Sequence, residues 1–255
     1  MPRNSWSHDE LIVAFNLYCK IPFGRIHNRN PEIIELASFI GRTPSAVSYK
    51  LANFASLDPE LKERGIKGAG NGSKGDQEVW NEFVADWERL AYESEAALSR
   101  IIGRPIEQCT GIDVSDIVAE GAEREAMVRI RVNQSFFRSA VVTAYERRCC
   151  ISGISVPELL NASHIVPWSR DINNRVNPRN GLCLNVLLDR AYDRGLITVT
   201  PELMVLVSPL LRESSGDPSL SGAVLRFHHQ LVTLPQRFRP DPALLDRHVA
   251  EIFQG

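Results

Sequence analysis

The chain has 255 residues, of which 44% are hydrophobic and 24% are charged, a composition typical of globular proteins and not of disordered ones. Its formal net charge of −2 argues against a protein that coats nucleic acid indiscriminately. No apolar run approaches the roughly 20 residues that a membrane span needs, and the opening MPRNSWSHDE is not a signal peptide, so we expect no association with membranes.

The cysteines are scattered and odd in number: Cys19, Cys109, Cys149, Cys150 and Cys183. Without a CxxC pair they predict neither a disulfide framework nor a four-cysteine zinc site. We therefore expect a cytoplasmic protein.

The first hundred residues carry the start and stop signals of helices. Ser7 followed by Glu10 has the pattern of a capping box, which predicts that a helix begins after Ser7. Asn30 before a proline predicts the start of a second helix, and Gly41 predicts its end.

A third helix is predicted directly after the second, with Thr43 as its cap. Val47, Leu51 and Phe54 form its apolar stripe. Two helices joined by so short a turn have the helix-turn-helix pattern. The outward face, with the turn before it, would present Arg42, Ser45, Ser48, Tyr49 and Lys50.

The later part of this half is predicted from composition and periodicity. Residues 67–76 are glycine-rich and predict a loop, and residues 77–102 have the apolar stripe of one long amphipathic helix. Residues 101–128 are acidic and mixed, which we interpret as a linker. The sequence thus predicts a helical domain over 1–100 and a second domain over 129–255.

The second domain mixes predicted helices and strands, so we expect an α+β protein. Helices are predicted over 133–148, over 182–195 with Gly195 as the stop, and from Asp241 onward. Short strands are predicted at 149–154 and 161–168, a hairpin at 196–207, and a further strand within 222–235.

The centre of this domain carries polar residues in an order that a packed core does not require. His164 follows NAS and precedes IVPW, Asn180 comes 16 residues later, Asp189 a further 9 and Asp193 a further 4. Taken alone, His164 fits a buried histidine that a backbone carbonyl satisfies. The two aspartates share one face of a predicted helix and repel each other. Either neighbouring arginines or a divalent cation would relieve that repulsion.

A strand, an irregular loop with an asparagine and a helix with acidic residues resemble the ββα-metal motif of HNH endonucleases. The resemblance rests on ASHIVPW and NPRNGLCLNVLLDRAYDRGLI, preceded by FFRSAVVTAYERRCCISGI, and it covers roughly residues 129–255. These motifs are similar to the bacterial restriction-type branch of the family. The resemblance implies that His164 is the general base, that Asn180 braces the loop, and that Asp189 and Asp193 hold the metal.

Two positions depart from the family pattern. Ser163 stands where the family often has an aspartate or histidine ligand, and it would act as a weak ligand through water. Leu188 stands where a histidine is frequent, so we expect no ligand there. Because both remaining ligands are carboxylates, we expect Mg²⁺, with Mn²⁺ as substitute and no organic cofactor.

The charge around the motif favours a polyanionic partner. Residues 129–194 hold ten arginines against five acidic residues, although the whole chain is slightly acidic. Arginine grips phosphate through two parallel hydrogen bonds. We expect Arg175, Arg179 and Arg190 to contact the DNA backbone.

The leading hypothesis is a metal-dependent DNA endonuclease in bacterial defence, including restriction that depends on a modified base. The front half resembles the Myb/SANT-like or helix-turn-helix class, which implies that its third helix contacts double-stranded DNA; a purely structural role is the alternative. Cutting both strands with one site per chain favours a homodimer. The competing hypotheses are a DNA-binding regulator with a degenerate HNH half, suggested by Ser163 and Leu188, and an effector nuclease that a partner activates.

Overall fold

The structure is a computed structural model that describes residues 5–65, 72–213 and 216–255. The chain divides into two compact units, Met1–Ala140 and Val141–Gly255. Residues 67–71 of the predicted glycine-rich loop lie outside the described residues. No helix of the described part is both long enough and apolar enough to cross a membrane.

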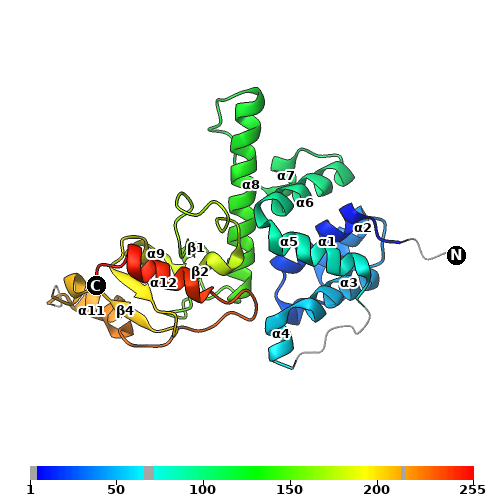
Figure 1. The fold of residues 1–255 in the computed structure, drawn as a ribbon. Coiled ribbons are helices and arrows are strands. Elements are labelled where there is room, and N and C mark those ends of the chain that lie inside the picture. Colours follow the sequence, from blue (N-terminus) through cyan, green and yellow to red (C-terminus); the bar gives the residue numbers. More distant parts are fainter. Residues whose placement is uncertain (1–4, 66–71, 214–215) are drawn as a thin grey trace. The chain divides into compact units, whose positions relative to one another are not determined.

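The first unit is built from helices in its described part (Figure 1). Their bounds are α1 (His8–Lys20), the 3₁₀ turn η1 (Phe23–Arg25), α2 (Pro31–Phe39), α3 (Pro44–Leu57), α4 (Pro59–Glu63), α5 (Lys74–Ala85), α6 (Trp87–Ile102), α7 (Ile106–Thr110) and α8 (Gly121–Ala144), within which the boundary between the units falls.

The predicted helix starts are confirmed. The Ser7 hydroxyl accepts a hydrogen bond from the Glu10 N–H, and the Glu10 carboxylate accepts one from the Ser7 N–H at 2.7 Å. Asn30 caps α2 and Thr43 caps α3 through their side-chain oxygens. Gly41 adopts the left-handed conformation, with φ of 65°, where α2 ends.

An aromatic cluster forms the core of the first unit. The Phe15 ring lies 5.0 Å from the Phe54 ring in an edge-on contact and 4.4 Å from the Phe83 ring. Val47 and Leu51 are buried beside Phe54, as the apolar stripe of α3 predicts. This packing determines which face of α3 remains outside.

Lys50 is not on that outward face, so this prediction is wrong. Its side chain is buried, with a residue exposure of 6%, and Nζ lies 2.6 Å from an oxygen of Asp76. Asp76 belongs to the capping box of α5, is fully buried, and also accepts a hydrogen bond from Asn53. A buried carboxylate needs a cation and hydrogen-bond donors, and the neighbouring helix supplies Lys50 for that purpose.

The long helix predicted over 77–102 is two helices. Asp86 leaves helical geometry, with φ of −150° and ψ of 80°, and its side chain caps α6 by accepting a hydrogen bond from the Arg89 N–H. An aspartate that bonds to the following backbone competes with helix continuation.

Residues 101–128 differ from the predicted linker. They contain α7 and the start of α8, and Ile117, Val128 and Val132 form a small core cluster there. The compact units meet within α8, whereas the sequence places boundaries at 100 and 129. The sequence did not predict this cluster because its apolar residues are widely spaced in an acidic segment. They come into contact and become buried only when the chain folds back on itself.

The second unit combines short helices with two small antiparallel sheets. Its elements are η2 (Pro157–Leu159), β1 (Leu160–His164), η3 (Pro178–Asn180), β2 (Gly181–Asn185), α9 (Val186–Asp193), β3 (Ile197–Val199), β4 (Val205–Val207), α10 (Pro209–Glu213), α11 (Pro218–Ala223), η4 (Leu225–Phe227) and α12 (Pro242–Glu251). β1 pairs with β2, and β3 pairs with β4. The helix α9 packs against β1 and β2 (Figure 1).

The hairpin β3–β4 and the start of α12 at Asp241 are confirmed, whereas three other predictions fail. Residues 149–154 form a turn closed by the Cys149 N–H on the Ile154 carbonyl at 2.8 Å. Residues 182–185 belong to β2 and not to the following helix. Within 222–235 the described chain forms the end of α11 and the turn η4, and its β pairing is limited to an isolated bridge at Leu231.

A close approach explains the glycine that follows α9. Gly195 has φ of 65°, and a Cβ atom there would lie 2.0 Å from the Ile252 carbonyl oxygen. Any side chain would collide with the backbone after α12. The predicted stop at Gly195 is thus also a packing requirement.

His248 ties α12 to the sheet and to α9. Its Nδ1 accepts a hydrogen bond from the Thr198 hydroxyl at 2.8 Å, and its Nε2 lies 3.3 Å from the Tyr192 carbonyl, which can only accept. The Tyr192 ring stacks on the imidazole at 3.8 Å. Burial lowers the pKa of His248 to about 4.

This pKa predicts a loss of stability in acid. The unfolded chain gains a proton near the ordinary histidine pKa of about 6.5, whereas folded His248 resists it until about pH 4. Stability is therefore complete above about pH 6.5 and falls with decreasing pH, by up to about 2 kcal/mol between pH 7 and pH 5.

Urea unfolding at pH 7 and at pH 5 measures this loss of stability. Hydrogen exchange of the α12 amides at the same two pH values shows whether the loss includes this helix. His248→Gln should lower stability at pH 7 and lose less of it on acidification than the parent protein. An equal loss in both proteins would remove His248 as the cause.

Candidate active site

His164 stands at the end of β1, opposite Gly181 of β2. Its Nε2 donates a hydrogen bond to the Arg175 carbonyl oxygen at 2.8 Å, since a carbonyl can only accept. In the neutral imidazole this places the lone pair on Nδ1. A backbone carbonyl does satisfy His164, as expected for a histidine with a purely structural role. The same hydrogen bond also leaves Nδ1 as the basic nitrogen of the neutral ring.

The environment of His164 favours the neutral ring. Burial lowers the pKa of His164, and the hydrogen bond to Arg175 and the negative charge of Asp189 oppose that effect only in part. The imidazole is consequently in the form that accepts a proton at neutral pH. The Asp189 carboxylate also lies near enough to act on it.

Asn180 joins the two ends of the loop that follows β1. Its side chain has no exposed surface, and its oxygen accepts a hydrogen bond from the Val166 N–H at 2.8 Å. Its Nδ2 donates to the carbonyls of Val166 at 3.0 Å and of Asn174 at 3.1 Å. Both ends of the amide are thus satisfied within the loop that carries Arg175.

Asp189 and Asp193 lie on α9, which begins after the Asn185 cap. Desolvation raises the pKa of Asp193, and the Asp189 carboxylate raises it further, although Arg190 and Arg194 act in the opposite direction. Neither aspartate forms an ion pair with any residue that the structure describes. The arginines therefore do not close around the acidic pair.

Asn161 contacts one of these carboxylates. From β1, its Nδ2 donates a hydrogen bond to Asp189 at 2.7 Å. This contact fixes the orientation of the carboxylate while leaving its charge uncompensated. The sequence reasoning missed Asn161; the signal was an amide three residues before the histidine on the same strand.

Ser163 offers a third oxygen beside the same strand end. It is buried, with 2% of its surface exposed, and its hydroxyl has no hydrogen-bond partner in the described chain. Buried hydroxyls usually have a hydrogen-bond partner, so the Ser163 oxygen fits the role of a ligand or of a contact to a bound water. By contrast, Leu188 is buried as an apolar residue, in agreement with the absence of a ligand there.

These oxygens fit a hard divalent cation. Two carboxylates that repel each other and an unpartnered hydroxyl are all oxygen donors of the kind that Mg²⁺ and Mn²⁺ prefer. Among the described residues, histidine, cysteine, aspartate and glutamate side chains form no group of three or more able to hold a metal. A site here would therefore rely on Ser163 and on waters or phosphate to complete it.

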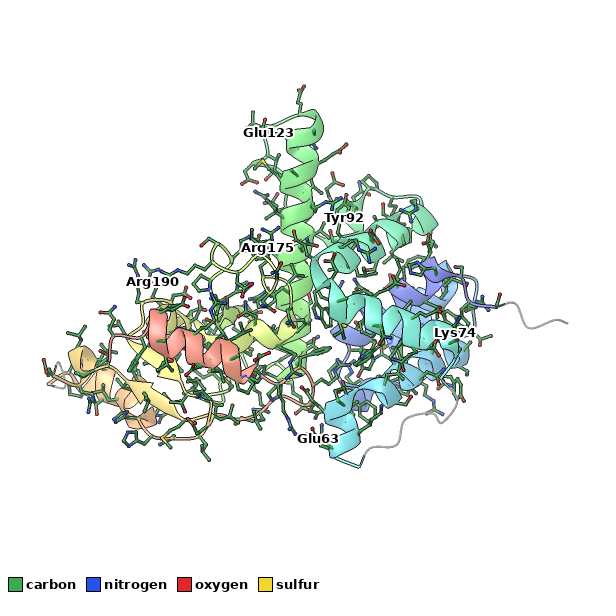
Figure 2. The ribbon with its side chains drawn as sticks, viewed as in Figure 1. Glu63, Lys74, Tyr92, Glu123, Arg175 and Arg190 are labelled. Carbon is green, nitrogen blue, oxygen red and sulfur yellow. The ribbon has the colours of Figure 1, made fainter. Side chains whose placement is uncertain are left out.

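The predicted phosphate-binding arginines have different surroundings. The Arg175 guanidinium lies 5.1 Å from the centre of the Trp168 ring, and Trp168 meets His164 edge-on at 5.7 Å. Arg190 is exposed and extends outward from α9 (Figure 2). The Arg179 carbonyl accepts a hydrogen bond from the Asp241 N–H at 3.0 Å, which anchors the start of α12.

The predicted outward face of the first unit is confirmed only in part. Ser45 and Tyr49 are exposed and Ser48 is half-buried. Arg42 instead donates two hydrogen bonds to Glu10, both at 2.9 Å, and its guanidinium lies over Trp6. A bidentate carboxylate partner occupies the donors that a phosphate would need.

Two arginines beside this face were missed. Arg25 and Arg29 are exposed and have no ion pair in the described chain, and Asn28 between them donates a hydrogen bond to Ser45 at 3.1 Å. The basic run RIHNR in the sequence was the available signal. It places positive charge next to the exposed start of α3.

Residues 149–200 match the sequence model of the HNH endonuclease family. The matched stretch contains β1, β2 and α9, and hence His164, Asn180 and both aspartates. No curated protein matches the chain. The match supports assigning this part of the chain to the HNH family and indicates nuclease activity.

The hydrogen bonds of Asn180 predict how the loop responds to substitution. Asn180→Asp keeps an oxygen for the Val166 N–H but removes both donors to the carbonyls, so the loop should lose order around Asn174. We expect faster amide exchange over residues 171–177, measured by hydrogen exchange, at a cost of about 2 to 3 kcal/mol in stability. Asn173→Asp, at an exposed loop position, is the control. Unchanged exchange in Asn180→Asp would contradict the bracing role.

Proposed function

We propose that the protein is a metal-dependent DNA endonuclease that hydrolyses phosphodiester bonds, with its catalytic site in the second unit. One observation carries the proposal: within the segment that matches the HNH family, Asn161 of β1, the strand that ends at His164, donates a hydrogen bond to Asp189 of α9 at 2.7 Å. This contact supports placing the proposed general base and the acidic pair in one site.

In this proposal each residue has a separate task. Neutral His164 takes a proton from the attacking water through Nδ1, and the Arg175 carbonyl holds the imidazole in place. Asn180 keeps that carbonyl in position by bracing the loop. Asp189, Asp193 and Ser163 would hold Mg²⁺ or Mn²⁺, which supplies positive charge to the phosphate and the leaving oxygen.

DNA binding is proposed for both units. Arg175, Arg179 and Arg190 hold backbone phosphates near the cleavage site. Ser45, Ser48 and Tyr49 meet the DNA from α3, and Arg25 and Arg29 replace Arg42 and Lys50 as the phosphate contacts there. Support comes from the exposure of Arg25, Arg29 and Arg190 and from the internal pairing of Arg42 and Lys50.

The biological setting is part of the proposal. A DNA-contacting unit joined to a nuclease unit suits a cytoplasmic restriction enzyme of bacterial defence, and two chains acting as a homodimer would cut both strands. Digestion of matched plain, methylated and hydroxymethylated DNA separates ordinary restriction from restriction that requires a modified base.

Replacing the general base should abolish cleavage without abolishing DNA binding. We expect His164→Asn to lower the rate of plasmid cleavage by at least ~10²-fold in Mg²⁺, because asparagine cannot accept the proton. The control is His229→Asn, an exposed histidine of the same unit with φ of 65°, which asparagine tolerates. Equal cleavage by His164→Asn would exclude this role. DNA binding without cleavage by the parent protein would favour the regulator with a degenerate HNH half.

Removing the acidic pair should weaken metal binding directly. We expect Asp189→Asn and Asp193→Asn each to reduce the affinity for Mn²⁺ by roughly tenfold or more, measured by calorimetry without DNA. Asp246→Asn removes the same charge from an exposed site on α12 and should leave the affinity unchanged. A similar loss of Mn²⁺ affinity in all three variants would mean that the overall charge of the protein attracts the ion and that the acidic pair is not a specific site.

A further inference from the structure

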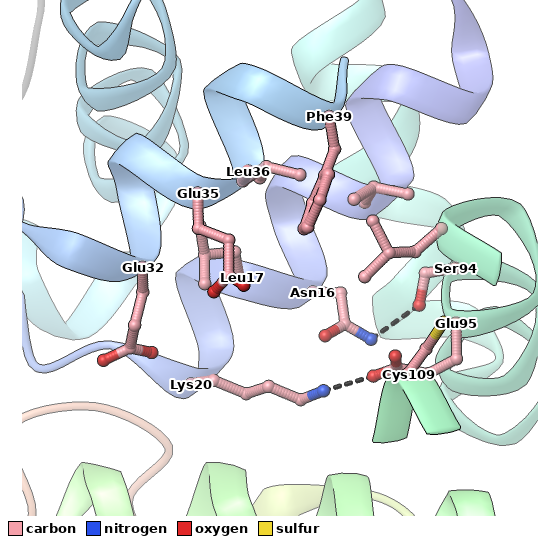
Figure 3. A pocket seen from close by; sticks show the side chains of 12 residues that line it. Asn16, Leu17, Lys20, Glu32, Glu35, Leu36, Phe39, Ser94, Glu95 and Cys109 are labelled. Carbon is pink, nitrogen blue, oxygen red and sulfur yellow. Dashed lines mark hydrogen bonds and ion pairs between the residues drawn. The ribbon is translucent and has the colours of Figure 1, made fainter. Parts of the chain in front are cut away.

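The first unit contains a pocket that the proposed nuclease chemistry does not use. It has a volume of about 160 Å³ and lies between α1, α2, α6 and α7 (Figure 3). Val13, Leu36, Phe39 and Leu98 provide apolar walls. A cavity of about 150 Å³ accommodates a molecule the size of benzene, so the pocket is large enough for a small organic ligand.

The pocket lining contains a hydrogen-bond acceptor that no described residue uses. Asn16 is 6% exposed, and its Nδ2 donates a hydrogen bond to the Ser94 hydroxyl at 2.7 Å. Its oxygen accepts no hydrogen bond from the described residues, and Figure 3 shows it turned away from Ser94, toward the side where Lys20 and Glu35 lie. A carbonyl oxygen without a protein partner can accept a hydrogen bond from a ligand, so a ligand with an N–H donor fits this end of the pocket.

The charged residues around the pocket favour a ligand with a positive charge. Lys20 forms an ion pair with the buried Glu95, so the charges of these two lining residues cancel. Glu32 and Glu35 of α2 also line the pocket and form no ion pair with described residues. The balance is therefore negative, which repels phosphates and carboxylates and attracts a cation.

We propose that this pocket binds a small primary alkylammonium ion. Its three N–H donors meet the Asn16 oxygen and the acidic groups of the lining, and its alkyl stem packs on the apolar walls. The half-buried Glu32 and the exposed Glu35 attract its positive charge, which stays close to solvent at the pocket's edge. The site stands apart from the nuclease chemistry, and neither proposal depends on the other.

Calorimetry on the full chain with n-pentylammonium tests the proposal. We expect saturable binding of one molecule per chain, with 1-pentanol and pentanoate each at least about tenfold weaker, because one lacks the charge and the other has the opposite charge. Absence of binding by n-pentylammonium, or equal binding by 1-pentanol, would overturn the proposal.

Matched variants locate the binding. Glu35→Gln should weaken it about threefold, whereas Glu78→Gln, the same change at an exposed position of α5, should leave it unaltered. Asn16→Leu should weaken it about tenfold, because the accepting oxygen is lost. Circular dichroism shows whether Asn16→Leu folds. If it does not, the test is the affinity of Glu35→Gln for n-pentylammonium compared with that of Glu78→Gln. Equal affinities in these two variants would overturn the assignment.

Discussion

The arrangement of the site depends on one buried amide. Asn180 satisfies its oxygen and its nitrogen entirely within the loop after β1, which it closes between Val166 and Asn174. That loop presents the Arg175 carbonyl, and this carbonyl holds Nε2 of His164. A buried polar group that loses its partners costs more than a hydrogen bond contributes, so the loop has little freedom to move. The asparagine thus acts on the imidazole through the backbone, without touching it.

The acidic pair on α9, unlike the Asn180 amide, is not fully satisfied by partners within the protein. Asp189 receives a hydrogen bond from Asn161, but no described cation lies within ion-pairing distance of either carboxylate. Burial raises the pKa of Asp193, and the negative charge of Asp189 raises it further, although Arg190 and Arg194 act in the opposite direction. In the first unit, by contrast, Asp76 pairs with Lys50 and Glu10 pairs with Arg42. Two helix-capping carboxylates of the first unit thus have a cation in contact, whereas Asp189 and Asp193 have no ion-pair partner among the described residues.

The same comparison changes the view of the first unit. Its two expected DNA-binding cations, the buried Lys50 and the partly exposed Arg42, pair instead with capping residues of α5 and α1. Exposed positive charge lies instead on Arg25 and Arg29, which the Asn28 contact to Ser45 places next to α3. The pocket beneath α2 is acidic and apolar, so it is unsuited to nucleic acid. Two surfaces of one small unit therefore favour ligands of opposite charge.

The sequence by itself determined what depends on near neighbours in the chain. Caps such as Ser7, Thr43 and Asp241 act on amides two or three residues away, so their residue types suffice to predict the helix starts. The spacing from His164 to the aspartates likewise identified the stretch that matches the HNH family.

Only the tertiary structure decided the contacts between distant segments. The apolar run before Val186 is a strand because it pairs with β1, and by sequence alone such a run cannot be distinguished from a buried helix. Lys50 is buried because Asp76, 26 residues away, needs a cation, and the pocket exists because α1, α2, α6 and α7 pack imperfectly around Asn16. Local propensity has no information about a partner that only folding brings within reach.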